Sequence, residues 1–543
     1  MTIVPTQRQI LAINSNSSMV ITACPGSGKT FVIVEKIRKE LQDLKSHKGV
    51  IAITFTVKAS RELKRKCKKD GFDVKSSFFG TIDHFCLSEI IYPFASKVYG
   101  KITDQVRCVL FDELHQEIKE HFPENSDQNP FLETHEYGRY HGFFLSCYEK
   151  GVIVLEAVGI IANFILDNSY ACRRYLEARY SSIYVDEYQD SSQPQHELFL
   201  KIIDMGLKGT AVGDVQQSIY AWRGSSPKFI NELVSESDIF EHHVIDTNHR
   251  CHPSITNYAN RLFSENCTLL NVDSIRMYHR CYEGTQLDVA TTLNTVIHNA
   301  MQKFNINLYG HVAILVRNNQ SLAYISQNLT IPHRIYTDDA LAGMNTKVTN
   351  FFSDLLRYRF DQTFLINDIV GFSDLEEILS SKKIQELREK IREFKKGSEN
   401  SLTNDICQLA GLCLNESITA LDIAALAEVV NTPDKLHQYS PANEEKLQVM
   451  TLHKSKGLEF EIVFHLDLYD WVFPYRVPGE TFNDKVYPSW EQDLNLHYVG
   501  ITRAKTACIL VHSKSRLKQD GSVKSGQPSD FLSMPCLAGL YKS

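Results

Sequence analysis

The sequence of 543 residues lacks an excess of basic residues, because 58 Lys and Arg stand against 65 Asp and Glu and the formal net charge is −7. A strongly basic chain would have favoured a nucleic-acid coat protein; its absence still permits a local cationic channel. The sequence also lacks a long apolar run. The longest, GVIVLEAVGIIANFIL, is interrupted by Glu156 and Asn163 and is too short to span a bilayer. We expect a buried helix there and no membrane span.

A secretion signal is also missing, because MTIVPTQRQILAI has no basic stretch followed by an apolar core. The 13 Cys are scattered without a pairing pattern, and the spacing of Cys407 and Cys413 fits no common metal site. An odd number of Cys without a secretion signal is typical of reduced thiols in a cytoplasm. We therefore expect a cytoplasmic protein whose Cys are nearly all structural.

Internal repeats and low-complexity linkers are absent too, and the chain is 43% hydrophobic and 23% charged, as in globular proteins. Short β-branched runs recur instead and are followed by polar turns and helical stretches, a pattern typical of buried parallel strands alternating with helices. Residues 90–175 and 341–440 break this pattern and are mainly helical. The sequence predicts a two-part α/β framework with two helical insertions. The runs are GVIAITF, SSIYVDE, GTAVGD, HHVIDT, HVAILV, LQVMTL, EIVFHL and ACILVH.

The segment ITACPGSGKT joins an apolar run, Met19–Ala23, to a turn that cannot belong to a core. Gly26 and Gly28 allow successive backbone N–H groups to point into one concavity. Lys29 adds a charge and Thr30 a hydroxyl. These groups suit a nucleoside triphosphate with its metal, the amides and Lys29 on the phosphates and Thr30 on Mg²⁺. The alternative is an ordinary turn between a strand and a helix.

The segment SSIYVDEYQD supplies the acids that such a site needs. Asp186 ends a predicted strand and can reach the metal, and Glu187 can polarise the attacking water. A solvated acidic turn is the alternative, but ligands bind at this edge of parallel sheets. Charge on the γ-phosphate also requires cations, for which Arg250 in DTNHRC and Arg503 in HYVGITRAK are candidates. From hydrophobic periodicity alone, both arginines would be predicted to lie on the surface.

Six motifs that span nearly the whole chain resemble those of UvrD/Rep/PcrA-type superfamily-one DNA helicases: ACPGSGKT, ITFTVKASREL, VDEYQD, VGDVQQSIYAWRG, TLHKSKGLEFEIVF and YVGITRAK. The resemblance implies two RecA-like domains with parallel sheets, ATP between them and single-stranded DNA across their top. It implies residues 1–89 and 176–236 for domain 1A, 90–175 for helical insertion 1B, 237–340 and 441–543 for domain 2A, and 341–440 for a reduced insertion 2B.

The same resemblance implies the roles of single residues at the nucleotide. Gln7 would read the adenine edge, Glu459 would contact the sugar, and Gln217 would sense the γ-phosphate. Phe31 and His249 stand where the family usually has Arg and Tyr beside the purine, so base selectivity would be relaxed. Arg250 and Arg503 would be arginine fingers, and Asp186 and Glu187 the metal-linked acid and catalytic base. The phosphate loop would comprise Ala23, Cys24, Pro25, Gly26, Ser27, Gly28, Lys29 and Thr30.

Single-strand binding without sequence preference needs aromatic faces and small donors. TFT and SIYAWRG offer both, although a Trp taken alone is more often part of a core. The basic helix KASRELKRKCKK is either a DNA patch or a solvated face. The resemblance implies DNA contacts by Thr54, Phe55, Thr56, Thr81, Tyr220, Trp222, Arg223, Thr451 and His453.

The sequence therefore favours an ATP- and Mg²⁺-dependent helicase on single-stranded or 3′-overhang DNA, with the 3′ to 5′ polarity of the family. A DNA-activated NTPase with little unwinding is the second hypothesis; intact Lys29 and Glu187 argue against a third, a non-enzymatic binding module. Short length and a reduced second insertion resemble the helicase-like subunits of Gabija anti-phage defence. That likeness implies a GajA-like, OLD-family nuclease partner in a hetero-oligomer; a DNA-repair helicase is the alternative.

Overall fold

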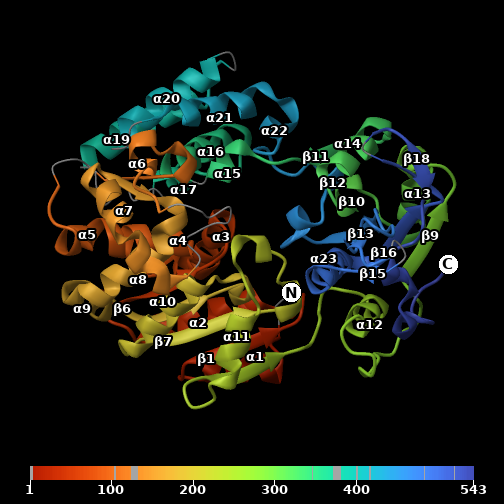
Figure 1. Cartoon of the computed structure of the whole chain (residues 1–543), viewed down its shortest axis with the longest axis horizontal. Coiled ribbons are helices and arrows are strands. Elements are labelled where there is room, and N and C mark those ends of the chain that lie inside the picture. The colour runs from red at the N-terminus through yellow and green to blue at the C-terminus, as the bar shows by residue number, and fades with distance from the viewer. Residues whose placement is uncertain are drawn as a thin grey trace. The chain divides into compact units, whose positions relative to one another are not determined.

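The computed structural model describes residues 4–102, 106–123, 133–344, 346–370, 381–398, 401–414, 418–481, 484–518 and 520–543. The chain forms two compact units, Met1–His249 and Arg250–Ser543. Each contains a six-stranded sheet in which every strand pairing is parallel (Figure 1). The predicted α/β class with parallel sheets is confirmed.

The sheet of the first unit has the strand order β3-β2-β6-β7-β1-β8. Both faces are covered, because Val20 belongs to one apolar cluster while Met19 and Ile21 belong to the other. This alternation explains why the strands are near-continuous apolar runs. The strands are β1 (Met19–Ala23), β2 (Gly49–Ile53), β3 (Phe78–Gly80), β6 (Tyr180–Val185), β7 (Lys208–Gly213) and β8 (Glu241–Ile245), and the helices outside the insertion are α1 (Gln7–Asn14), α2 (Lys29–Asp43), α3 (Val57–Cys67), α10 (Gln193–Asp204) and α11 (Lys228–Ser235).

The end of the first unit lies later than the sequence predicts. We expected the second framework to begin at residue 237, but β8 pairs with β1 along its whole length, from Met19 opposite Glu241 to Ala23 opposite Ile245. The two units accordingly divide between His249 and Arg250. The run HHVIDT is therefore the edge strand of the first sheet.

The first insertion follows β3 and returns at β6. Its apolar side chains, among them Phe143, Ile161 and Ile165, share one cluster with Ile51 and Ile183 of the sheet. The apolar run at 151–166 is not helical throughout: β5 (Val152–Val154) pairs with β4 (Arg107–Val109), and the helix begins only at Val158. The helices are α4 (Ile82–Phe85), α5 (Tyr92–Val98), α6 (Gln116–Lys119), α7 (Tyr137–Glu149), α8 (Val158–Asn168) and α9 (Tyr170–Arg179).

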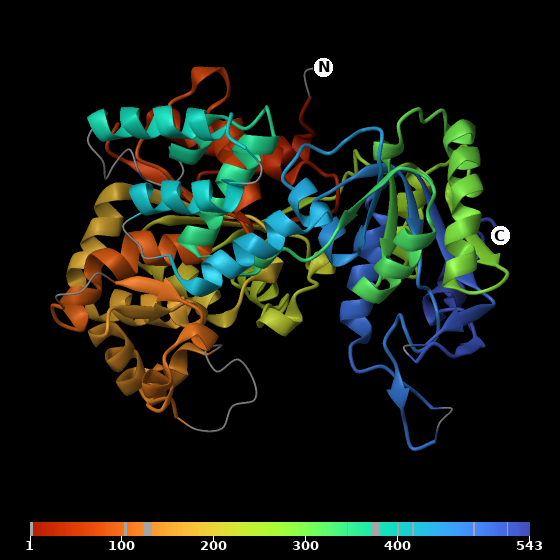
Figure 2. The ribbon, with the colours of Figure 1, turned by 90° about the horizontal axis from the view of Figure 1, so that it is seen from above.

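The sheet of the second unit has the order β11-β12-β10-β13-β16-β9. Figure 2 shows α13 in green at its edge, and side chains of α13 and α14 pack on one face. The strands are β9 (Met277–Tyr282), β10 (Val312–Val316), β11 (His333–Tyr336), β12 (Leu447–Thr451), β13 (Phe460–His465) and β16 (Ala504–Ser513); the helices are α12 (Pro253–Arg261), α13 (Gln286–Phe304), α14 (Asn319–Asn328) and α23 (Trp490–Ile501); and two short hairpins are β14 (Val477–Pro478) with β15 (Lys485–Val486) and β17 (Ser515–Leu517) with β18 (Val523–Ser525).

The second insertion lies between β11 and β12 and is helical, as predicted. Its buried residues, including Phe352, Leu355 and Ile406, form a cluster separate from that of the second sheet. Among the described segments, no helix is both long and apolar enough to cross a membrane. The helices are α15 (Ala340–Met344), α16 (Lys347–Phe360), α17 (Ile366–Val370), α19 (Ser381–Phe394), α20 (Leu402–Cys413), α21 (Ala420–Asn431) and α22 (Pro433–His437).

Candidate nucleotide-binding and DNA-binding sites

The predicted phosphate loop lies between β1 and α2. Gly26 and Gly28 have φ angles of 67° and 84°, which favour glycine, and α2 begins at Lys29 directly after the second of them. The Cys24 carbonyl accepts hydrogen bonds from Ser27 Oγ (2.8 Å) and Lys29 Nζ (3.5 Å). The loop thus presents the N-terminus of a 15-residue helix with a lysine beside it, an arrangement that favours phosphate.

Gln9 holds this loop, although no motif in the sequence indicates that role. Its Nε2 donates to the Ser27 carbonyl (2.8 Å), and its Oε1 accepts from the Thr6 backbone N–H (2.7 Å). A Cβ placed on Gly28 would lie 2.8 Å from Gln9 Nε2, so the close approach requires glycine. Thr6 and Gln9 form a capping box, whose T-x-x-Q pattern was the available signal. Gln7 is exposed on α1, and its predicted role stays a prediction.

The two acids follow β6 directly. The Asp186 backbone N–H donates to the Ile53 carbonyl (3.0 Å), and Asp186 Oδ1 accepts from the Glu187 backbone N–H (3.0 Å). Glu187 has a φ angle of 57°, a left-handed conformation that is uncommon outside glycine. A constrained backbone therefore positions this carboxylate at the carboxyl edge of the sheet.

Gln217 lies on the turn after β7, where its Nε2 donates to Asp214 Oδ2 (2.6 Å). Burial raises the pKa of Asp214, the positive charge of Lys29 acts to lower it, and Glu187 acts to raise it. β1 pairs with β7, with Thr22 opposite Gly213, so the phosphate loop and the turn that carries Gln217 follow neighbouring strand ends. Gln189 bonds both Glu187 Oε2 (2.6 Å) and the Asp214 N–H (3.0 Å), which joins Glu187 to the same turn.

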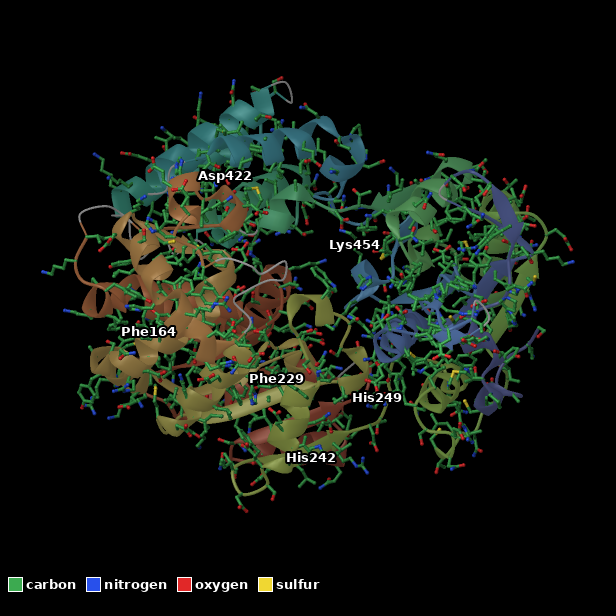
Figure 3. The ribbon with its side chains drawn as sticks, viewed as in Figure 1. Phe164, Phe229, His242, His249, Asp422 and Lys454 are labelled. Carbon is green, nitrogen blue, oxygen red and sulfur yellow. The ribbon has the colours of Figure 1, made fainter. Side chains whose placement is uncertain are left out.

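The end of the first unit also meets the phosphate loop. The His249 backbone N–H donates to the Gly26 carbonyl (3.0 Å), and Figure 3 labels this residue. Phe31 lies in the first turn of α2 and is half-buried against the apolar cluster on that face of the sheet. His249 is therefore beside the loop, whereas Phe31 also contributes to the core.

An aromatic group stands at the same edge of the sheet. Phe55, after β2, and Tyr220, after β7, stack with ring centroids 5.0 Å apart and an interplanar angle of 17°. Trp222 meets Tyr220 edge-on at 6.5 Å and is 66% exposed. Trp222 is therefore a surface residue rather than a core residue. The side chain of Arg223 lies outside the part of the chain that the structure describes.

The predicted threonine contacts already have local bonds. Thr54 Oγ1 donates to the Thr56 carbonyl (3.0 Å), while Thr56 and Thr81 accept from backbone N–H groups as the caps of α3 and α4. All three lie at the carboxyl edge of the first sheet, Thr54 and Thr56 after β2 and Thr81 after β3. The cations Lys64–Lys66 occupy the last turn of α3, where they complement the helix dipole. That accounts for the basic helix without DNA.

In the second unit, Arg250 and Arg503 both donate hydrogen bonds to the segment Leu458–Glu459, which precedes β13. Arg250 Nε donates to Glu459 Oε2 (2.8 Å), and Glu459 also pairs with Lys505 Nζ (2.8 Å). Although burial opposes it, hydrogen bonds and the charges of both cations lower the pKa of Glu459. Arg503 is 1% exposed and donates to the carbonyls of Val499 (2.9 Å) and Leu458 (3.1 Å). A carboxylate holds one arginine, and backbone carbonyls hold the other.

The last predicted DNA contacts follow β12. Thr451 ends the strand and is buried, and His453 begins the turn His453–Ser455 and is half-buried. Lys454, which follows His453, donates to the Thr337 carbonyl (2.7 Å) and pairs with Asp338 (3.1 Å), so the turn is anchored to the segment after β11 (Lys454 is labelled in Figure 3).

The chain matches the UvrD/REP helicase N-terminal domain over residues 3–147 and 111–238, and the UvrD-like helicase C-terminal domain over residues 336–515. These matches cover more than half of it. The chain belongs to the UvrD-like DNA helicases. Membership implies two RecA-like domains, which confirms the predicted fold, and it implies ATP, with Mg²⁺ as the usual metal.

Three relatives align over nearly the whole chain. The Gabija protein GajB of Bacillus cereus is 28% identical over 92% of this chain and 94% of its own length. The ATP-dependent DNA helicase Rep of Buchnera aphidicola is 25% identical over 95% and 94%, and PcrA of Staphylococcus aureus is 25% identical over 95% and 83%. The predicted likeness to UvrD, Rep and PcrA, and to the Gabija subunit, is confirmed.

Proposed function

We propose that this chain hydrolyses ATP to translocate 3′ to 5′ on single-stranded DNA and to displace the complementary strand. The proposal depends on the residues that lie together at the carboxyl edge of the first sheet. There, Lys29, Glu187 and Gln217 are gathered, and the Phe55–Tyr220 stack leads from the same loop that carries Gln217. Nucleotide chemistry and a base-stacking platform thus share one structural edge.

In this proposal, Lys29 and the loop amides bind the phosphates and Glu187 polarises the attacking water. Asp186 and Thr30 offer the oxygen ligands that Mg²⁺ prefers, and the bound ion would neutralise phosphate charge. Gln217 senses the γ-phosphate. Arg250 and Arg503 stabilise the charge that develops during hydrolysis.

The remaining predicted residues keep their proposed roles. His249 and Phe31 flank the purine, Gln7 reads its edge and Glu459 contacts the sugar. Trp222 stacks on a base, Thr81 and Thr451 contact the DNA backbone, and Arg223 and His453 support that grip. Separation of each base pair costs about 1.4 kcal/mol, which ATP hydrolysis covers, so direction depends on the order in which the grips release.

The test compares 3′-overhang, 5′-overhang and blunt duplexes in strand-displacement and ATPase assays on the same preparation. We expect displacement only from the 3′ overhang. Lys29→Ala and Glu187→Gln should lower kcat at least about 100-fold. Lys201→Ala is the matched control, because Lys201 forms ion pairs with Asp167 and Glu197 on the surface of the same unit. Near-normal turnover in either site variant would refute the assignment.

A DNA-end-activated NTPase is the second candidate, and the short second insertion between β11 and β12 favours it. ATPase activity without displacement from a 3′ overhang would select this candidate. By its likeness to GajB, the chain would serve in an anti-phage complex with a GajA-like OLD-family nuclease rather than in DNA repair. Co-purification with such a nuclease, repeated without residues 341–440, tests partnership and docking surface together.

A further inference from the structure

A buried amide connects two parts of the proposed active site that the motifs treat separately. Gln189 is 0% exposed. Its Nε2 donates to Glu187 Oε2 (2.6 Å), and its Oε1 accepts from the Asp214 backbone N–H (3.0 Å). One side chain thus bonds both the water-activating carboxylate after β6 and the start of the loop after β7.

The surroundings leave this amide little freedom. A Cβ on Gly213 would lie 2.5 Å from Gln189 Oε1, so only glycine leaves space at the end of β7. On the other side of the residue, Ser218 Oγ donates to the Gln189 carbonyl (3.2 Å). Gln189 is therefore bonded to both ends of the turn Asp214–Ser218, to Asp214 through its side chain and to Ser218 through its backbone carbonyl.

That turn leads into the aromatic group. Asp214 accepts from Gln217, and two residues after Ser218 the chain reaches Tyr220, which stacks on Phe55. A displacement of Tyr220 by a DNA base therefore has a short covalent and hydrogen-bonded route to the Glu187 carboxylate. The route runs through the turn and ends at the Gln189 amide.

We propose that Gln189 is a positioning residue that couples occupancy of the Phe55–Tyr220 platform to the orientation of Glu187. With DNA bound, the turn and the amide hold Glu187 Oε2 toward the attacking water; without DNA, the turn and the amide shift together and hold it in another orientation. The inference rests on the proposed function. It adds the residue through which DNA regulates hydrolysis.

The test uses the full chain and measures ATPase activity with and without oligo-dT, together with the Kd of a fluorescent ATP analogue. Gln189→Leu keeps the volume and removes both bonds. We expect kcat with DNA to fall about 100-fold while KM stays within about twofold, because positioning acts on the chemical step. The ratio of kcat with DNA to kcat without DNA should approach one.

Gln189→Glu separates the two bonds, since its carboxylate can still accept from Asp214 N–H but repels Glu187. Lys29, Asp186 and Asp214 also lie at this edge of the sheet, and like charges at positions 187 and 189 push the two side chains apart. We therefore expect Gln189→Glu, like Gln189→Leu, to bring the ratio of kcat with DNA to kcat without DNA close to one. Gln216→Leu is the matched control on the same turn, because only the backbone N–H of Gln216 bonds Asp214.

The outcomes are distinguishable. A wild-type protein that DNA does not stimulate would overturn the proposed function itself. A stimulated wild type with unchanged stimulation in Gln189→Leu or in Gln189→Glu would overturn the coupling role alone. Weakened binding of the ATP analogue together with a lowered Tm in both Gln189 variants would also overturn it, as the sign of a purely structural amide.

Discussion

The two helical insertions differ in how they obtain a core. The first shares its apolar cluster with one face of the first sheet, whereas the second has a cluster of its own, apart from that of the second sheet. Since a helix layer that covers a sheet face is part of the domain core, the first insertion cannot be separated from its RecA-like domain. The second insertion is instead a helical subdomain with its own core. Similar positions in the chain therefore do not imply similar structural roles.

Deletion of each insertion should show the largest contrast. Replacement of residues 90–175 by a Gly/Ser linker exposes one face of the first sheet, and we expect an insoluble or unfolded product. Replacement of residues 341–440 should leave a cooperative unfolding transition and ATP binding. Circular dichroism and calorimetry check both variants. The contrast fails if neither variant folds or if both do.

Single substitutions in each core test the contrast between the two insertions more precisely. Ile161 of the first insertion is buried in the same cluster as Ile51 of β2 and Ile183 of β6, so Ile161→Ala should cost about 2–5 kcal/mol in global stability of the first unit. Leu355→Ala removes about 2–5 kcal/mol within the second insertion only. The protection of backbone amides from hydrogen exchange shows which elements lose stability in each variant. Protection lost from β12 or β13 in Leu355→Ala would contradict the separation.

Lowering the pH should destabilise the sheet of the second unit before it destabilises the second insertion. His465 and His497 are fully buried, bond each other (2.9 Å) and lie in the sheet half of the unit. Burial lowers the pKa of His465 to about 4 and that of His497 well below its ordinary value. Between pH about 6.5 and 4, the unfolded chain therefore binds more protons, and stability present above pH about 6.5 is lost as the pH falls.

For His465 alone, the loss amounts to about 3 kcal/mol at pH about 4. Hydrogen exchange at pH 7.5 and 5.5 should show β13 and α23 weakening before α16 and α20. His497→Phe should flatten this pH dependence, because a Phe can occupy the stack on Phe531 (4.9 Å) without a proton. His437→Gln is the exposed control. A sheet and an insertion that weaken in parallel would argue for one cooperative unit.

The sequence anticipated the interior of each sheet better than its edges. The central strands are buried apolar runs, and the pattern found them. β3, β9 and β11 were missed, and all three are edge strands: β9 carries His279 and Arg280, and β11 carries His333 and Arg334. β9 and β11 each have one neighbouring strand and are part-exposed, so they lack the apolar signature, whereas β3 is buried but only three residues long. The fourth edge strand, β8, lies in the run HHVIDT that the pattern did indicate.

The site divides in the same way. Lys29, Asp186 and Glu187 were located from motifs because phosphate and metal chemistry dictate their residue types and spacing. Gln9 and Gln189 were not, because a buried amide follows no periodicity and its partners, Ser27 and Asp214, are distant in sequence. Such residues become visible only when hydrogen bonds are assigned in three dimensions.

The smallest test uses one helix cap from each insertion. Ser169 caps α9 and accepts from the Cys172 N–H (3.2 Å), and Thr419 forms a capping box with Asp422 on α21 (Asp422 is labelled in Figure 3). Either change to Ala should cost about 1 kcal/mol. Ser169→Ala should lower the Tm of the whole first unit, because its helix belongs to the shared core; Thr419→Ala should raise exchange only within residues 418–431. If both caps cost the same free energy but affect different numbers of residues, the core rather than the cap decides how far a perturbation spreads. If both substitutions affect equally large regions, the distinction between the two insertions is refuted.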